Sequence, residues 1–144
     1  MGTTYEEVYE RYRARVRNYD FLDYNSAVRD IYQHDLLMLS VSDFEEICVQ
    51  DLNDRDDEIL TFNIDLTNRE KDILALGMVL HFVEPYVYNT DALQNAMSTK
   101  DFSLYSPANL LEKMTELMTT TEARLRREIN LYSFRNGEIS RLTE

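Results

Sequence analysis

The stretch Lys100-Asp101-Phe102-Ser103-Leu104-Tyr105-Ser106-Pro107-Ala108-Asn109-Leu110-Leu111 joins an aromatic loop to the start of a long predicted helix. Ser106 is a good N-cap because its hydroxyl can accept a hydrogen bond from an unpaired backbone N–H of the first turn. Pro107 suits the first helical position, where its fixed φ favours the helix and its missing N–H costs nothing. No helix breaker follows until Asn136-Gly137, a typical helix stop. The sequence therefore predicts a long C-terminal helix followed by a tail.

A single stripe runs along this predicted helix at three- and four-residue spacing. Its members are Leu110, Leu111, Met114, Leu117, Met118, Thr121, Leu125, Ile129 and Tyr132. A helix from Pro107 to Phe134 would be about 40 Å long at 1.5 Å per residue. Since this is long for a chain of 144 residues, we expect its far end to project.

A second segment, which begins at Leu66-Thr67-Asn68-Arg69-Glu70, is expected to form the buried centre of the fold. Thr67 and Glu70 make a capping box, and Leu66 precedes it as a hydrophobic staple would require. The helix that follows is apolar on nearly all sides from Ile73 to Val83, which is typical of a buried helix. Gly77 lowers the stability of the helix by about 1 kcal/mol relative to alanine. Because close approach of a neighbouring helix would compensate for this cost, we expect one there. Pro85 is expected to kink or end the helix.

The N-terminal third shows two further helical patterns. Thr4-Tyr5-Glu6-Glu7 is a capping box, followed by a stripe expected to face a core or an interface: Tyr5, Val8, Tyr9, Tyr12, Val16 and Tyr19. A second helix is predicted from Ser26 through Leu39, and it either continues or breaks at Ser40-Val41-Ser42. Ser42 and Glu45 offer a fresh capping box if it breaks. Cys48 is expected in the core as a small hydrophobe.

Composition and charge narrow the class of protein. Hydrophobic residues make up 44%, and Gly 3 and Pro 2 are low counts, which favours long helices over a many-stranded sheet. The net charge of −12 argues against broad binding of nucleic acid or anionic membranes. The fold class is predicted as all-α, a helical bundle of about four to five helices with a long C-terminal helix and an extended C-terminal tail. Residues 1–134 would form the domain, and residues 135–144 would form a docking tail.

Catalytic and ligand-binding patterns are missing from the sequence. The acidic stretch Asp51–Glu58 invites a calcium-loop interpretation, but Arg55, Asp56 and Phe62 stand where an EF-hand needs an acid or amide, a glycine and a glutamate. A solvated connector is the expectation instead. No phosphate-binding loop, Gly-x-Ser-x-Gly or His-Glu-x-x-His motif occurs, and a single cysteine excludes an internal disulfide. We expect no enzyme activity, catalytic residue, cofactor, metal or membrane segment.

Several packing and loop motifs of the central and C-terminal parts have a counterpart in a known family. They are Asp65-Leu66-Thr67, Glu70, Ile73-Leu74-Ala75-Leu76-Gly77-Met78-Val79, Pro85, Tyr88-Asn89, Leu93 and residues 100–111. In these motifs the chain resembles the head–tail connector (adaptor, or head-completion) proteins of long-tailed bacteriophages of Gram-positive hosts. The resemblance covers about half of the chain, and in the N-terminal third only the helix pattern corresponds.

The resemblance implies a virion protein of the phage neck, made in the host cytoplasm and assembled at the head–tail interface. Such proteins form an α-helical ring, by default of twelve copies, beneath the portal protein. The ring extends the DNA channel and gives a stopper or tail-terminator protein a place to attach. In several members the C-terminal segment reaches the portal. The corresponding portal-docking candidates here are Tyr132, Phe134, Arg135, Asn136, Ile139 and Leu142.

Two charged sets fit this interpretation. An acidic channel wall would repel DNA phosphates and let DNA slide, and its candidates are Asp54, Asp56, Asp57 and Glu58. Arginines could pair with acids of neighbouring copies and offset the repulsion between acidic subunits. These inter-subunit candidates are Arg11, Arg13, Arg15, Arg17, Arg124, Arg126 and Arg127.

Two alternatives remain open. One is a stopper or tail-terminator protein of the neck, although those are usually richer in strands and glycine. The other is an acidic helical protein that imitates DNA and inhibits a nucleic-acid-binding enzyme, which the net charge favours. However, the acids here are interleaved with arginine and tyrosine instead of being arrayed in regular pairs.

Overall fold

The computed structural model describes residues 2–17, 33–88 and 107–143, with the side chains of residue 17, residue 107, residue 110 and residues 137–143 left aside. The described residues form four helices and a two-stranded antiparallel hairpin: α1 (Tyr5–Arg17), α3 (Gln33–Phe44), β1 (Arg55–Asp56), β2 (Thr61–Phe62), α4 (Asn68–Tyr88) and α6 (Pro107–Thr143). Arg55 pairs with Phe62 in the hairpin, and Asp56 pairs with Thr61. The predicted all-α bundle is confirmed.

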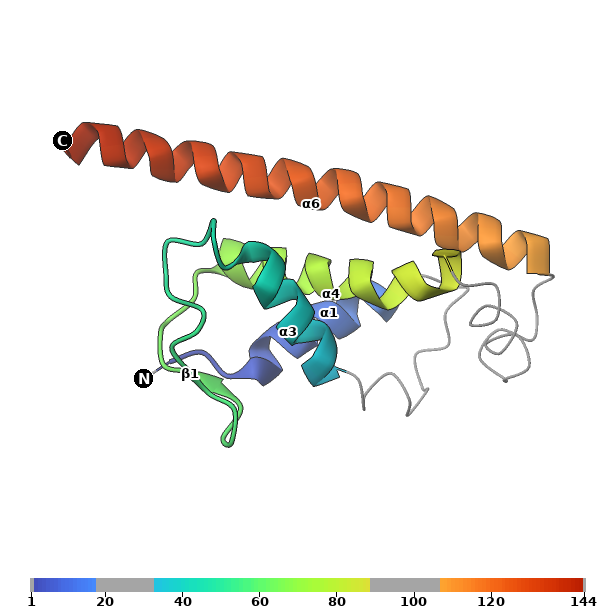
Figure 1. The fold of residues 1–144 in the computed structure, drawn as a ribbon, viewed down its shortest axis with the longest axis horizontal. Coiled ribbons are helices and arrows are strands. Elements are labelled where there is room, and N and C mark those ends of the chain that lie inside the picture. Colours follow the sequence, from blue (N-terminus) through green and yellow to red (C-terminus); the bar gives the residue numbers. More distant parts are fainter. Residues whose placement is uncertain (1, 18–32, 89–106, 144) are drawn as a thin grey trace.

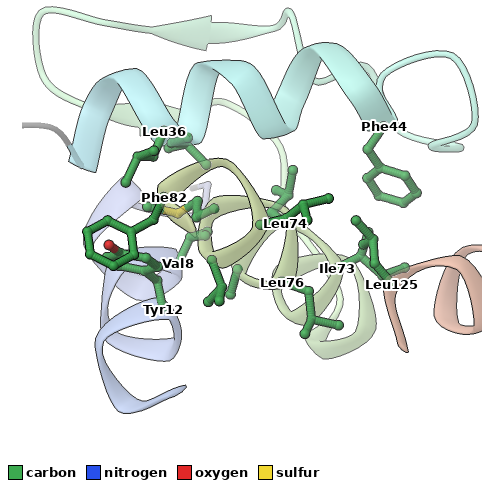
Figure 2. Close-up of a cluster of buried hydrophobic side chains, with 14 of the residues drawn as sticks. Val8, Tyr12, Leu36, Phe44, Ile73, Leu74, Leu76, Phe82 and Leu125 are labelled. Carbon is green, nitrogen blue, oxygen red and sulfur yellow. The ribbon is translucent and has the colours of Figure 1, made fainter. Parts of the chain in front are cut away.

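Helix α4 is the centre of the bundle, as its all-round apolarity predicts. It packs against α1, α3 and α6, and every residue from Ile73 to Leu80 is buried. Figure 1 shows α6 lying along one side of α4 while α1 and α3 lie on the other. Side chains from all three neighbours gather around α4 in Figure 2, among them Tyr12, Leu36 and Leu125. Burial of this apolar surface is the main force that holds the four helices together.

The close approach expected at Gly77 occurs against α3. A Cβ atom added to Gly77 would lie 2.1 Å from the Ser40 Oγ atom, well inside van der Waals contact. The Ser40 hydroxyl donates a 2.7 Å hydrogen bond to the Leu74 carbonyl. Ser40 therefore fills the space that the glycine leaves and links the two helices in the buried core.

The start of α4 follows the predicted capping pattern in full, and the start of α1 follows half of it. Glu70 N–H donates to the Thr67 hydroxyl at 3.2 Å and Thr67 N–H donates to Glu70 Oε1 at 2.8 Å, which is the full reciprocal box. At α1, Thr4 N–H donates to Glu7 Oε2 at 2.8 Å, but Glu7 N–H donates to the Thr4 carbonyl at 3.2 Å and not to its hydroxyl. The stripe of α1 faces the core, since its described members are all at most 7% exposed: Tyr5, Val8, Tyr9, Tyr12 and Val16. Tyr19 lies outside the described residues.

At two points where the sequence left the course of a helix open, the helix continues. Helix α3 continues through Ser40-Val41-Ser42 and ends at Phe44, so Ser42 does not cap a new helix. Its hydroxyl instead donates to the Met38 carbonyl one turn earlier, at 3.1 Å. Helix α4 continues past Pro85 to Tyr88. The predicted start of the α3 helix at Ser26 and the capping role of Ser106 lie outside the described residues.

Helix α6 begins at Pro107 as predicted but does not end at Asn136-Gly137. It spans 37 residues to Thr143, which is about 55 Å at 1.5 Å per residue. The predicted extended tail is therefore wrong, because residues 135–143 continue the helix. Asn136 does not turn the chain, since its Nδ2 donates to the Tyr132 carbonyl one turn earlier at 2.9 Å. A glycine inside a helix costs only about 1 kcal/mol, which the surrounding helical residues offset.

The segment between α3 and α4 is more ordered than a simple connector. Its hairpin buries Phe62 completely, and the Phe62 ring lies 4.9 Å from the Tyr5 ring of α1. Ile59 and Leu60, between the two strands, are 67% and 44% exposed. The hairpin is thus anchored by Phe62 and presents an acidic and apolar tip to solvent.

Candidate functional site

A buried carboxylate, Glu70, ties α6 to α4 and to the segment after α3. Its Oε2 accepts a 2.6 Å hydrogen bond from the Tyr132 hydroxyl and a 3.3 Å bond from the Cys48 thiol. Its Oε1 accepts 2.8 Å bonds from Gln50 Nε2 and from the Thr67 N–H. Glu70 is 2% exposed, and among the described residues no cation pairs with it. Four donors therefore take the place of a counter-ion.

The pKa values of this cluster show which groups carry charge. Burial alone would raise the pKa of Glu70, but the hydrogen bonds from Tyr132, Thr67, Gln50 and Cys48 together hold it below its ordinary value. Burial and the bond to Glu70 raise the pKa of Tyr132. Burial likewise raises the pKa of the Cys48 thiol to about 11. At neutral pH the cluster is therefore a carboxylate held by protonated donors, and Cys48 is a poor nucleophile.

Tyr132 therefore has a structural role. It is 5% exposed, its ring packs edge-on to Phe44 at 5.1 Å, and its hydroxyl also accepts the Val49 N–H at 2.9 Å. Its predicted role in portal docking is wrong because none of its polar or aromatic surface is free. Cys48 is likewise half-buried and hydrogen-bonded, not a simple core hydrophobe.

The other portal-docking candidates lie further along α6. Phe134 is 63% exposed, and Arg135 is exposed as well. Asn136 is half-buried and uses its side chain within the helix. The side chains of Ile139 and Leu142 are outside the described residues, so their docking role stays a prediction.

The face of α6 that points away from α4 forms a shallow, basic and apolar hollow. We call this surface the α6 outer face; it is an open hollow of about 550 Å³ lined by Ala123, Arg126, Arg127, Asn130, Leu131 and Phe134. A second hollow of about 300 Å³ lies between α4 and α6 and shares Arg126 and Asn130 with the first. In the sequence, the arginines between positions 124 and 127 indicated the basic part of this surface. The apolar residues beside them were not assigned to it.

The arginines predicted to bridge copies fall into two groups. Arg11 pairs with Asp72 of its own chain at 2.7 Å, and Arg13 pairs with Glu6. These two and Arg15 are thus engaged by their own chain, and their predicted inter-subunit role stays a prediction. The side chain of Arg17 is outside the described residues.

The second group lies on α6 and remains available to a partner. The side chains of Arg124, Arg126 and Arg127 are exposed. Within residues 2–17, 33–88 and 107–143, none of them makes an ion pair. An exposed helix face with unpaired guanidinium groups suits an acidic partner.

The acidic residues predicted to line a channel belong to the hairpin, and three of them hold it together. Asp57 accepts a 2.5 Å hydrogen bond from the Tyr5 hydroxyl, and this bond, with Arg55 and His34 nearby, lowers the pKa of Asp57. Asp54 accepts a bond from Asn63, and Asp56 accepts the backbone N–H of Glu58.

Glu58 differs from the other three acids. Its side chain is exposed and has no ion pair or hydrogen bond to any described residue. The tip of the hairpin is therefore an ordered acidic surface whose outermost carboxylate is free to bind.

Metal and membrane sites have no counterpart in the described residues. Across these residues no group of three or more His, Cys, Asp and Glu side chains is arranged to hold a metal ion. None of the described helices is both long and apolar enough to cross a lipid bilayer. His81 of α4 lies 2.5 Å from Asp43, which joins the end of α3 to α4, and 3.6 Å from Glu84 of its own helix.

Comparison with known proteins adds no relative. No protein-family model matches the chain, and neither a curated protein nor a solved structure matches it. Function is therefore inferred from the surfaces of this chain and from the motifs that resemble those of connector proteins.

Proposed function

We propose that this chain is a structural subunit of a phage neck, which forms a ring beneath the portal, extends the DNA channel and joins head to tail. The observation that carries the proposal is α6, a 37-residue helix fixed to the core along part of its length and exposed along its outer face. The motifs of residues 65–111 that resemble connector proteins support the same role.

The anchoring of α6 gives its C-terminal end a defined direction. Arg69 of α4 pairs with Glu128 at 3.0 Å, and Glu70 accepts the Tyr132 hydroxyl. Beyond Tyr132 the helix continues to Thr143, a further distance of about 16 Å. Figure 1 shows this end extending past the start of α4. In the proposed ring, residues 135–144 reach the portal and the other side of the ring receives a stopper or tail-terminator protein.

The acidity of the chain is compatible with a channel. A net charge of −12 gives a surface that repels DNA phosphates, so DNA can pass through a ring of such subunits without binding. The hairpin uses the carboxylates of Asp54, Asp56 and Asp57 for its own hydrogen bonds. In the proposed ring, the acidic surface as a whole would therefore repel DNA in the channel.

The alternatives receive less support. A DNA mimic needs a regular row of free carboxylates, whereas Glu7, Asp72 and Glu128 are paired with cations of their own chain. A stopper or tail-terminator protein is typically rich in strands, and the described residues contain two strands of two residues each.

Binding to the portal protein of the same phage tests the proposal. We expect electron microscopy of the mixture to show a ring on the portal, by default of twelve copies, and we expect deletion of residues 135–144 to abolish it. The control Leu111→Asp changes an exposed residue at the other end of α6 and should bind as the full chain does. A strictly monomeric chain that does not bind the portal but binds a nuclease or RNA polymerase would favour the DNA-mimic alternative.

A further inference from the structure

The α6 outer face has an unusual character for this molecule. The chain as a whole carries −12, yet this face presents Arg126 and Arg127 without ion partners among the described residues. Beside them, Leu131 and Phe134 expose 42% and 63% of their surface. A surface that is both basic and apolar selects a partner that is both acidic and apolar.

The tip of the hairpin has the complementary character. Its sequence runs Asp56-Asp57-Glu58-Ile59-Leu60, and the side chain of Glu58 is free to bind. Ile59 and Leu60 expose 67% and 44% of their surface next to these acids. The bond between Tyr5 and Asp57 fixes the tip to α1, so little ordering entropy is lost when a partner binds it.

These two surfaces cannot meet within one chain. Figure 1 shows α6 along one edge of the molecule and the tip of the hairpin at the opposite edge, with α4 between them. Two complementary surfaces on opposite sides of one molecule make a head-to-tail contact between copies, and a contact of this kind closes into a ring when its rotation allows.

We propose that the α6 outer face of one copy binds the acidic hairpin tip of the next copy. Arg126 and Arg127 then face Glu58 and its neighbouring acids, and Phe134 packs on Ile59. This inference deepens the proposed ring and rests on it for the expectation that copies associate. In this inference Phe134 belongs to the contact between copies and no longer to the portal-docking residues.

The size of the two surfaces sets the strength of the contact. A few exposed side chains on each copy bury much less than the 1,200–2,000 Å² typical of stable complexes. A single contact is therefore weak, and closure of a ring or binding to the portal strengthens it through effective concentration. Because charges are exposed at both surfaces, added salt weakens the association.

Cysteine cross-linking in the full chain locates the contact. One variant carries Ile59→Cys and the other carries Phe134→Cys, and the two are mixed and mildly oxidised. Val49→Cys replaces Ile59→Cys as the control because Val49 is equally exposed, at 68% against 67%. Cys48 is present throughout, and a mixture without introduced cysteines measures its background. We expect the 59–134 disulfide to form at least about tenfold faster than the 49–134 disulfide, since disulfides need close Cβ atoms.

Light scattering on the same protein separates the proposed contact between copies from the proposed ring. Replacement of both Arg126 and Arg127 by glutamate should weaken self-association at least about tenfold, and Arg124→Glu, at the edge of this face, should weaken it less. Association that resists the double replacement, or equal cross-linking from positions 49 and 59, overturns the docking inference alone. A chain that stays monomeric at all concentrations, with and without portal, overturns the ring as well.

Discussion

Glu70 is a buried carboxylate that helps to fix the position of α6. Burial of an unpaired carboxylate is normally costly, and here four hydrogen bonds from Tyr132, Cys48, Gln50 and Thr67 offset that cost. The same bonds fix the start of α4 to the middle of α6. Loss of any one of them removes a hydrogen bond from a carboxylate that is 2% exposed.

Replacement of Tyr132 by phenylalanine tests the connection to α6. The ring stays packed on Phe44, but Glu70 loses a donor and the Val49 N–H loses its acceptor. We expect the free energy of unfolding to fall by about 1–3 kcal/mol, measured by urea denaturation. The control Tyr88→Phe changes a 73% exposed tyrosine and should cost almost nothing. Equal stability of the two variants would contradict the cluster.

Replacement of Glu70 by glutamine tests its charge. Since the folded-state pKa lies below the ordinary value of 4.5, the carboxylate stabilises the fold above pH 4.5. That contribution is lost as the pH falls through the folded-state pKa. We expect the original chain to lose stability more steeply below pH 4.5 than Glu70→Gln does, as followed by thermal unfolding across pH. Parallel pH profiles would show that Glu70 is not held as a carboxylate.

At the scale of the elements, the crossing of α3 and α4 depends on one glycine and one serine. Gly77→Ala would favour helix formation locally but would place a Cβ 2.1 Å from the Ser40 Oγ atom. We expect a net loss of about 1–3 kcal/mol in the free energy of unfolding. In a Ser40→Ala background the loss should shrink, because the clash with Oγ is gone. An unchanged loss in that background would place the strain elsewhere.

The C-terminal part of α6 offers a second test at this scale. Because the helix continues through Gly137, Gly137→Ala should stabilise the terminal turns by about 1 kcal/mol. We expect slower hydrogen exchange of the amides of residues 138–143 in this variant. Unaltered exchange there would indicate that the segment is extended, as the Asn136-Gly137 pair alone suggests.

The elements that could be predicted from sequence are those with a local signal. The capping box at Thr67 and the apolar run from Ile73 to Val83 each lie within a few turns, and both are confirmed. At Thr4 only half of the predicted box forms. The ends of the helices could not be predicted as well. Pro85 and Gly137 weaken a helix by amounts that packing and neighbouring turns can offset, so neither ends one.

The candidate site was less predictable because its contacts are distant in sequence. Tyr132 was assigned to a docking surface, and no local pattern indicates its bond to Glu70, 62 residues away. Arg11 and Arg13 were predicted to contact neighbouring copies. Their partners Asp72 and Gln33 in the same chain could not be foreseen, because those contacts depend on how α1 packs. By contrast, Arg124, Arg126 and Arg127 fall between positions of the apolar stripe, and they are exposed as that spacing suggests.

At the scale of the whole molecule, charge is distributed unevenly over a bundle centred on α4. The α6 outer face is basic and apolar, while the tip of the hairpin on the opposite side is acidic and apolar. The core explains why the chain folds, and these two surfaces explain why copies of an acidic protein would associate. In the proposed ring, association between opposite surfaces would leave the C-terminal end of α6 free for the portal.

The mass of the assembled species tests the proposed ring most directly. Native mass spectrometry of the full chain, across a range of protein concentrations and with and without portal, measures that mass. We expect a concentration-dependent series of oligomers that ends in a closed ring, twelve copies by default, with the portal favouring the ring. A single monomer mass under every condition would contradict the proposed function.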